Sequence, residues 1–592
     1  MKKIGLGIDL YRNIIFRLLL TVSVLLTPVL LFAAGSYKDS GSGEANDPYI
    51  LKTAEHIVEL SNETSFTHRH YRLDADIDMS GVEFKKIGGD NGFVGDFNGN
   101  NHKISNVTYI SETEDYVGFF SKVSNSSIYD ITFENVNIKG KLYVGGVAGI
   151  ILNTNLRNVS VSGRVEADWS VIGGIAGVYI SDDKPTEIIN VRNLADVYAK
   201  YSNEIGAGDC ETGEEADCAG GVFGRCDLYN SVVKYLVNAG NVVGDGLNVG
   251  GIVGFNYSYL AIENSVNIGD VRGGCGSISN NIIASRVGGI VGYSCYGYFL
   301  KCVNTGVVSS NCSDSKYLGG IGGTLVGESI EDCFNSGFVK GSSYVGGGVG
   351  HIDPIFEDIK GVDKTVNVGP VCGSGDYCNV IVGLSAIQLS GLNYFDSTLS
   401  KNSDKTAMGL SLDDLKSAKM LSELNETRSS WTQLDSFLYP VPNMEDNTEV
   451  YGYPDDFNEI LYFASLPVPF DSVSADKKLM SQFELYPVDG ITYSSSTGCL
   501  QIKGHNVGLA KVGDDTLFIN YKNSRRVIPV YVGTVDTLLF SGGKGTNAKP
   551  YVLTTIGDVR KLAEMVNEEV AYDDASKNWS NGKYFYLAND IA

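Results

Sequence analysis

The chain has 592 residues, with 46 Lys plus Arg against 70 Asp plus Glu and a formal net charge of −24. That length predicts several structural units at ~150 residues each. A surface this acidic would repel a phosphate backbone, which argues against a nucleic-acid partner. Glycine occupies 71 positions while hydrophobic residues stay at 43%, a combination that excludes both collagen and disorder. The 6 histidines leave little material for His-based catalysis or metal binding.

Residues 1–35 have the order of a secretory signal peptide. Lys2, Lys3, Arg12 and Arg17 precede an apolar run over residues 18–32, and the small residues Ala33-Ala34-Gly35 follow it. The run is shorter than the ~20 residues that a transmembrane helix needs, so we predict cleavage rather than a membrane anchor. The mature chain is therefore expected to lack a membrane span and to be extracellular or at the cell surface.

A Gly-Gly motif flanked by aliphatic residues recurs after residue 116. Its first glycines are spaced by 28, 47, 30, 38, 31 and 27 residues, which is a solenoid period interrupted by insertions. A degenerate copy, Val117-Gly118-Phe119-Phe120, precedes the first pair. The seven pairs are Gly145 and Gly146, Gly173 and Gly174, Gly220 and Gly221, Gly250 and Gly251, Gly288 and Gly289, Gly319 and Gly320, and Gly346 and Gly347.

A second motif, apolar-Asn-x-Gly-x-apolar, lies between the glycine pairs. Its glycine follows the first glycine of the pair by 20, 19, 18, 18 and 23 residues, so the core of each unit is nearly constant in length. In stacked coils, the equivalent asparagines would form a ladder of hydrogen-bonded amides at the ~4.8 Å strand spacing. The expected ladder residues are Asn238, Asn267, Asn304, Asn335 and Asn367.

We predict an all-β chain whose main unit is a right-handed parallel β-helix, a solenoid. Short β-rich runs punctuated by glycine fit strands that turn corners, because glycine adopts positive φ without steric cost. Aligned glycines would also let neighbouring backbones approach closely. A β-propeller is the alternative, but its blades need ~40 to 45 residues, which is longer than the shortest repeats here.

These motifs resemble the GLUG-type repeat of bacterial surface and adhesin-like proteins, and the resemblance covers about residues 116–395. Within the repeat region, 116–400, it implies a β-helix that binds a surface ligand. Residues 36–115 look like the N-terminal cap and first coils of such a helix, with a short helix at about residues 54–60. A cap is physically required, because a terminal coil must cover the apolar end of the solenoid.

The cap pattern returns at 538–592, where a Gly-rich start, Pro550-Tyr551-Val552-Leu553, a helix at about 556–567 and a Tyr-rich strand follow in order. We expect the start of a second β-helix there, in a truncated chain. Between the caps, 401–460 predicts a helix at 411–425 and a linker at 440–456. Residues 461–537 predict a small β-sandwich-like domain of immunoglobulin-like size.

The chain has 11 cysteines, and none shows the short paired spacing of a structural zinc site. Cys302 and Cys333 both stand two residues before a ladder asparagine. In adjacent coils they would be close enough for a disulfide, although a pair of buried thiols is the other interpretation. Further disulfides could join the loops that carry Cys210, Cys218, Cys275 and Cys312.

Two features could form a binding surface. The extra residues of the longer repeats fall at about 199–217, 273–286 and 309–316, and insertions at one repeat position project from one edge of a solenoid. They are either a binding edge or neutral loop growth. Tyr116, Tyr143, Tyr317 and Tyr344 share one repeat position. They either pack the coils or form a strip on which sugar rings could stack.

Sequence signals for catalysis are weak. Asp182 and Asp183 are adjacent, so on a strand they would point to opposite faces rather than into one cleft. GLUG-type repeats accompany IgA-cleaving metallopeptidases, but their His-Glu-x-x-His zinc motif does not occur in this sequence. His68-Arg69-His70 could place two imidazoles on one face of a strand, and we interpret it as a solvated turn.

The sequence therefore predicts an exported, non-catalytic, adhesin-like scaffold without a cofactor or metal, which binds a glycan or protein surface ligand. A secreted carbohydrate-active enzyme, either a polysaccharide lyase or a hydrolase, is the alternative. A passive cell-envelope spacer is the third possibility.

Overall fold

The computed structural model describes residues 35–444 with gaps, and isolated strands from 484 to 587. The gaps are 170, 183, 201–216, 230, 246–247, 275, 279–280, 284–285, 311–314, 328, 354–360, 370, 374–376, 386–390, 398–406 and 434–438. Beyond 444, the described residues are 484–485, 491–494, 499–502, 505–506, 515–521, 524–530, 551–553 and 585–587. The predicted signal peptide lies outside the described residues, apart from Gly35.

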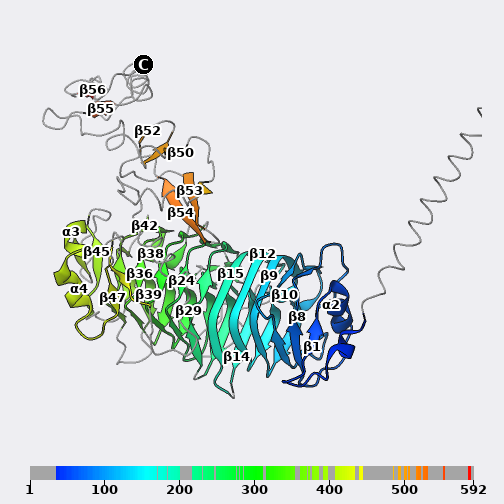
Figure 1. The fold of residues 1–592 in the computed structure, drawn as a ribbon. Coiled ribbons are helices and arrows are strands. Elements are labelled where there is room, and N and C mark those ends of the chain that lie inside the picture. The colour runs from blue at the N-terminus through cyan, green and yellow to red at the C-terminus, as the bar shows by residue number, and fades with distance from the viewer. Residues whose placement is uncertain are drawn as a thin grey trace, which may run out of the picture.

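The chain folds as a parallel β-helix, as the repeat predicts (Figure 1). Each coil contributes a short strand to a first sheet, turns at the glycine pair into a second sheet, and returns along a third. We call these the glycine sheet, the second sheet and the long sheet. In one coil, β10 (Leu142–Gly145), β11 (Ala148–Leu152) and β12 (Asn155–Ala167) serve these three roles. The strands stack in order along the axis rather than forming separate blades.

The glycine sheet consists of β7 (Asp115–Val117), β10, β13 (Ile172–Gly173), β16 (Cys218–Gly220), β21 (Asn248–Gly250), β28 (Arg286–Gly288), β33 (Lys316–Gly319), β38 (Ser343–Gly346) and β43 (Cys378–Asn379). The second sheet consists of β8 (Phe120–Ser124), β11, β14 (Ala176–Ser181), β17 (Phe223–Leu228), β22 (Val253–Asn256), β29 (Val291–Cys295), β34 (Gly322–Val326), β39 (Val349–Asp353) and β44 (Val382–Ser385).

The long sheet has unbroken strands in the early coils and three short segments per coil later. Its first members are β1 (Tyr49–Leu51), β2 (His70–Leu73), β3 (Ile77–Asp78), β4 (Asp96–Asn98), β5 (Lys103–Ser105), β6 (Thr108–Ile110), β9 (Ser127–Gly140), β12 and β15 (Glu187–Ala199). The segmented coils follow as β18 (Val232–Lys234), β19 (Val237–Asn238), β20 (Val242–Gly244), β23 (Ala261–Glu263), β24 (Val266–Asn267), β25 (Val271–Gly273), β30 (Tyr298–Leu300), β31 (Val303–Asn304), β32 (Val308–Ser310), β35 (Ile330–Glu331), β36 (Phe334–Asn335), β37 (Val339–Gly341), β40 (Val362–Asp363), β41 (Val366–Asn367), β42 (Val371–Gly373), β45 (Tyr394–Asp396) and β46 (Met408–Leu410).

The glycine pairs stack in register, because Gly173 pairs with Gly220, Gly220 with Gly250 and Gly250 with Gly288. The expectation that such glycines supply positive φ at the corners is wrong for all seven pairs. Space requires them instead: a Cβ on Gly221 would overlap the carbonyl oxygen of Gly251 and the amide of Asn238. The second glycine of a pair therefore makes room for the ladder asparagine of its own coil.

Left-handed corners are occupied by asparagine, aspartate and tyrosine rather than by the paired glycines. Asn125 has φ 49°, Asn153 has φ 45° and Tyr143 has φ 55°. Asparagine and aspartate tolerate this region because their short side chains bond locally, whereas a tyrosine there must be held by its surroundings.

The N-terminal cap contains the expected helix. The short 3-10 helix η2 (Tyr37–Ser40) precedes β1, and α2 (Ala54–Ser61) follows it. Thr53 caps α2, since its hydroxyl accepts from the His56 N–H at 3.4 Å. Ile57 and Leu60 on α2 are fully buried, so this helix covers the apolar end of the first coils.

Residues 407–444 pack along the outside of the last coils. The expected helix at 411–425 is broken into α3 (Leu412–Leu415) and α4 (Ala418–Leu424), because Ser417 caps a new helix there. The antiparallel pair β47 (Trp431–Thr432) and β48 (Val441–Pro442) follows. The expected linker at 440–456 therefore starts inside a packed segment, in which Val441 and Met444 are buried.

Beyond residue 444 the described strands are antiparallel except at the end of the chain. They are β49 (Glu484–Leu485), β50 (Ile491–Ser494), β51 (Cys499–Ile502), β52 (His505–Asn506), β53 (Asp515–Tyr521) and β54 (Ser524–Val530). At the end, β55 (Tyr551–Leu553) pairs in parallel with β56 (Phe585–Leu587), and β1 pairs in the same way with β2. No helix among the described residues is long and apolar enough to cross a membrane.

The possible disulfide between Cys302 and Cys333 is not formed, and both residues are buried free thiols. The Cys302 N–H donates to Cys333 Sγ at 3.4 Å, while Cys333 Sγ donates to the carbonyl oxygen of Glu331 at 3.3 Å. Each thiol thus has backbone partners in the core, and burial raises the pKa of Cys333 well above its usual value. Cys210, Cys275 and Cys312 lie outside the described residues; Cys218 is buried, and Cys295 is disulfide-bonded.

Candidate binding groove

The tyrosine column packs the coils against one another. Tyr116 stacks on Tyr143 with ring centroids 5.1 Å apart, and Tyr317 stacks on Tyr344 at 5.2 Å. The sequence analysis missed Tyr377, which extends the second stack at 5.2 Å. Lys122 Nζ lies 4.0 Å from the centroid of Tyr116. Because neighbouring rings cover the ring faces, the structure favours coil packing over a sugar-binding strip.

The asparagine motif forms a continuous buried ladder. Nδ2 of Asn238 donates to Oδ1 of Asn267, and the chain of bonds runs on through Asn304 and Asn335 to Asn367 at 2.7–2.8 Å. Asn193 adds a rung before Asn238, at 2.8 Å. All six side chains are 0–2% exposed, so the ladder stabilises the core and is not a binding surface.

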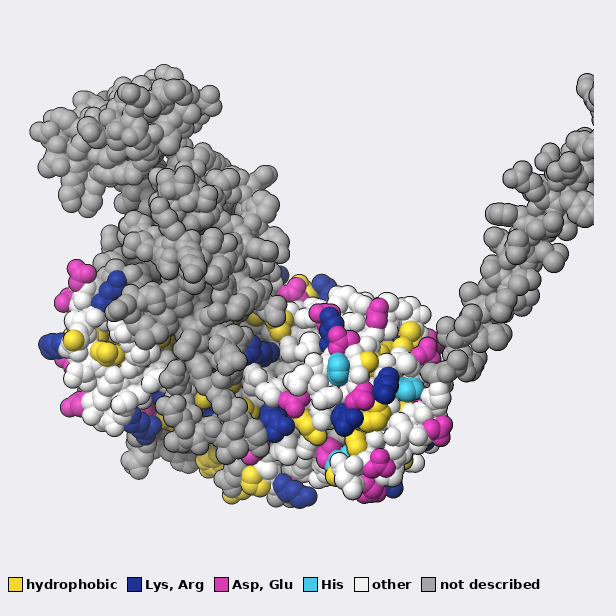
Figure 2. Space-filling view, in the orientation of Figure 1, with side chains coloured by type: hydrophobic (Ala, Val, Ile, Leu, Met, Phe, Trp, Pro, Cys, Tyr) yellow, Lys and Arg dark blue, Asp and Glu magenta, His cyan; other side chains and the backbone are white. Residues whose placement is uncertain are grey.

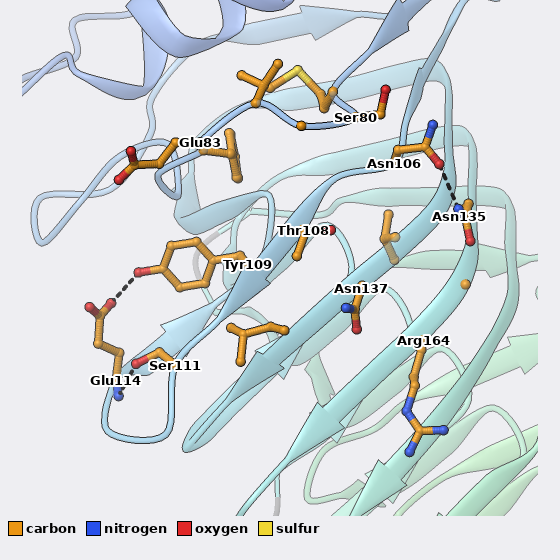
Figure 3. A pocket seen from close by; sticks show the side chains of 17 residues that line it. Ser80, Glu83, Asn106, Thr108, Tyr109, Ser111, Glu114, Asn135, Asn137 and Arg164 are labelled. Atoms are coloured by element: carbon orange, nitrogen blue, oxygen red, sulfur yellow. Dashed lines mark hydrogen bonds between the residues drawn. The ribbon is translucent and has the colours of Figure 1, made fainter.

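The remaining surface feature is an open groove of about 1130 Å³ over the first coils (Figure 3). One side is the loop that carries Ser80 and Glu83. The other sides are formed by Thr108 and Tyr109 of β6, Asn135 and Asn137 of β9, and Arg164 of β12. Ile110 is 58% exposed at its rim. The groove therefore combines hydroxyl, amide and apolar groups on rigid strands.

A β-bulge shapes the centre of the groove. The register between β9 and β12 shifts at Val161 and Gly163, where Asn135 is the extra residue with φ 53°. Gly163 has φ +120°, and a Cβ there would overlap the backbone of Val136. Bulges re-aim side chains next to functional sites, and this one turns Asn135 outward while Val136 stays buried.

Exposed polar side chains form a second, outer ladder at the groove. Asn106 Nδ2 donates to Asp78 Oδ1 at 2.8 Å, and Asn135 Nδ2 donates to Asn106 Oδ1 at 2.7 Å. The first of these bonds is the main cause that lowers the pKa of Asp78. Asn106 and Asn135 are 29 residues apart, but they lie before the first glycine pair, so the repeat pattern did not single them out.

The groove's charged groups are paired within the protein. Lys86 Nζ lies 2.7 Å from Glu114 Oε2, and Tyr109 donates its hydroxyl proton to the same oxygen at 2.7 Å. These bonds, that of Lys86 first, hold the pKa of Glu114 below its usual value. Arg164 pairs with Glu166. Acidic and basic side chains are also interspersed on the part of the N-terminal coils visible in Figure 2.

Other candidates from the sequence are only partly described. Most of the insertion loops, namely 201–216, parts of 275–285 and 311–314, lie outside the described residues. Asp182 accepts from Asn153 Nδ2 at 3.1 Å, and Asp183 is not described. His68 and His70 do lie on one side of the chain, and the structure adds Asp96 beside them.

No family model matches the sequence. Halomucin from Haloquadratum walsbyi (strain DSM 16790 / HBSQ001) is 32% identical over 148 residues, which are 23% of this chain and 2% of halomucin. The crystal structure of a putative immunoglobulin A1 protease from Bacteroides ovatus matches with a TM-score of 0.30 and 16% identity, covering 69% of this chain and 95% of that one. The chain thus spans a small fraction of the curated relative that it matches.

Proposed function

We propose that this chain is an exported, non-catalytic, adhesin-like scaffold of the GLUG-repeat type, which holds a glycan in the groove over its first coils. The groove carries the proposal, since it offers amide and hydroxyl side chains beside an aromatic ring on a rigid β-helix. Pyranose rings present both hydroxyls and apolar C–H faces, and mostly apolar pockets with a few polar groups suit small ligands in general. A binding function needs no group beyond these.

The electrostatics of the groove support binding over hydrolysis. A glycoside hydrolase needs one carboxylic acid with a raised pKa and a second carboxylate across the same cleft. Glu114 has a lowered pKa and two internal partners, so it is an ionised acceptor rather than a proton donor. The paired charges also favour a neutral ligand over a charged one.

The proposal is tested by screening the full chain on a glycan array and by pull-down with polysaccharides, followed by product analysis. We expect saturable binding with the glycan unchanged. Tyr109→Ala and Asn137→Ala should each weaken it by about tenfold, equivalent to roughly 1.4 kcal/mol. Tyr229→Ala is the matched control, because Tyr229 is 57% exposed and lies outside the groove. Shortened or unsaturated products would establish an enzyme, and equal losses in all three variants would move the binding site away from the groove.

A further inference from the structure

Three potential metal ligands meet on the outside of the N-terminal cap. His68 Nε2 lies 3.6 Å from Asp96 Oδ1, and His70 Nδ1 lies 3.1 Å from Asp96 Oδ2. One ligand atom from each of the three residues falls within 4.8 Å of the others. The two imidazole rings are in edge-to-face contact, with centroids 5.4 Å apart. Two histidines and a carboxylate thus converge from two coils.

The register of the first coils brings these residues together. β2 pairs with β4 so that His70 is directly opposite Asp96. Tyr71 points into the core, so His70 points outward, and His68, two residues earlier, lies on the same side. Asp96 is 28 residues after His68 in the sequence. No local spacing links it to the histidines, which is why the sequence alone shows only His68-Arg69-His70.

Backbone contacts hold the site in place without a ligand. The Asp96 N–H donates to the Arg69 carbonyl oxygen at 2.8 Å, and the His70 N–H donates to the Gly43 carbonyl oxygen at 2.9 Å. Arg69 is the nearest cation in sequence, but its guanidinium pairs with Glu44 at 3.0 Å. The peptide between the two histidines is therefore fixed at both ends, while its positive charge is engaged elsewhere.

We propose that His68, His70 and Asp96 bind a divalent transition metal of the zinc class. Metal–ligand bonds of about 2.0–2.1 Å in a tetrahedron place the ligand atoms about 3.3 Å apart, and the two measured separations, 3.1 and 3.6 Å, lie on either side of that value. Two imidazoles with one carboxylate suit zinc, copper or nickel, whereas calcium and magnesium prefer oxygen ligands. The side chain of His68 is 46% exposed, so water can complete the coordination.

The test is a titration of Zn²⁺ into the full chain, purified without a histidine tag, by isothermal calorimetry at neutral pH. We expect saturable binding that is lost in His68→Ala and in Asp96→Asn. Because changes in outer-shell partners alone lower metal affinity about 10- to 100-fold, loss of a direct ligand should cost at least that much. With Cu²⁺ as the probe, electron paramagnetic resonance should show coupling to two nitrogens in the parent and to one in His68→Ala.

His102→Ala is the matched control. His102 Nδ1 lies 3.0 Å from Asp76 Oδ1 in the same cap, so this pair has the same histidine–carboxylate contact but a single imidazole. Its loss should leave the Zn²⁺ affinity unchanged. Circular dichroism checks folding, and since both variants alter partly exposed side chains, either one alone can decide the question. An absence of saturable binding, or an affinity that neither His68→Ala nor Asp96→Asn lowers, would overturn the site.

Discussion

Each asparagine of the buried ladder makes several hydrogen bonds, which fix both its position and its orientation. Nδ2 of Asn304 donates to Asn335 Oδ1 at 2.8 Å and to the Gly306 carbonyl oxygen at 3.0 Å, while its Oδ1 accepts from Asn267 at 2.7 Å. Buried amides are tolerated when every group is satisfied, and a half-satisfied network costs more than an apolar core. The ladder thus specifies how neighbouring coils register.

Replacement of one rung by its acid should therefore destabilise the β-helix. Asn304→Asp keeps the side-chain volume but removes both donated bonds and buries a carboxyl group, so we expect a loss of about 3 kcal/mol or more. The loss should be larger at pH 7, where the carboxyl group tends to ionise, than at pH 4. Urea unfolding followed by circular dichroism measures it, with the exposed Asn137→Asp as control. Equal unfolding midpoints for the two variants would contradict this role of the ladder.

Asp217 is a buried acid whose titration should affect stability. Both of its carboxylate oxygens lack a hydrogen-bond partner within the part of the chain that the structure describes. Burial, and secondarily the charge of Asp245, raise its pKa from 3.8 to about 8. Since the fold favours the protonated form, its stabilising contribution is complete below pH 3.8 and is lost as the pH rises to about 8.

Asp217→Asn should then stabilise the protein at pH 9 and change little near pH 4, since an amide resembles the protonated acid and does not ionise. The measurement is the unfolding midpoint of parent and variant across this range, with the exposed Asp90→Asn as control. A constant difference between parent and Asp217→Asn at all pH values would show that Asp217 does not titrate in this way.

The ladder also shows what a sequence pattern can reach. Five rungs were predictable because an Asn-x-Gly motif recurs at a nearly constant distance from a glycine pair. Asn193 occupies the same column, but Ala195 stands where the other motifs have glycine, so the pattern did not match. His70 and Asp96 could not be connected from the sequence, because only the register of the coils places them side by side.

At the scale of elements, the corner between the glycine sheet and the second sheet depends on the glycine pair. A Cβ on Gly320 would overlap the carbonyl oxygen of Gly347 and the amide of Asn335. Gly322, two residues later, opens β34, and a Cβ there would meet only Leu325, at 3.1 Å or more. Its register partners Val291 and Val349 already carry side chains.

The two glycines of this one corner should thus respond differently to alanine. Gly320→Ala should unfold the neighbouring coils or lower the stability by several kcal/mol, since backbone cannot yield as a side chain can. Gly322→Ala should be neutral or slightly stabilising, because alanine restricts the unfolded chain. Thermal unfolding of the two variants side by side checks this, and comparable losses would show that glycine is needed there for backbone flexibility.

The elements that the sequence analysis missed are those without a repeated signal. The strands and glycine pairs recur, so their number and order could be predicted. The groove lies over coils that precede the first glycine pair, and its bulge depends on a single register shift at Gly163. Likewise, the break between α3 and α4 depends on one capping serine inside an otherwise helical pattern.

At the scale of the whole molecule, the β-helix has an outer apolar column that needs a cover. Val266, Val303 and Val366 precede ladder asparagines, so they face away from the amide core, yet each is 0% exposed. In the same column, the ring of Phe334 contacts that of Tyr439, at 6.5 Å between centroids. Polar bonds add to this contact, because Trp431 Nε1 donates to Asp332 Oδ1 and the Tyr439 hydroxyl donates to Asp396 Oδ2, each at 2.8 Å. Residues 407–444 thus form part of the β-helix unit rather than a tether to the next domain.

A chain that ends at residue 400 should therefore be less stable and more prone to aggregate than one that ends at 444, although it keeps every glycine pair. The shorter chain would expose the valine column, and contiguous apolar surface of this kind promotes association. Dye binding to exposed apolar surface and size-exclusion chromatography measure the difference. Trp431→Phe in the longer chain is the milder companion, since it removes only the hydrogen bond to Asp332 while the ring still packs. If the two chains showed equal dye binding and equal unfolding midpoints, residues 407–444 would be dispensable and the boundary of the β-helix unit would lie at its last coil.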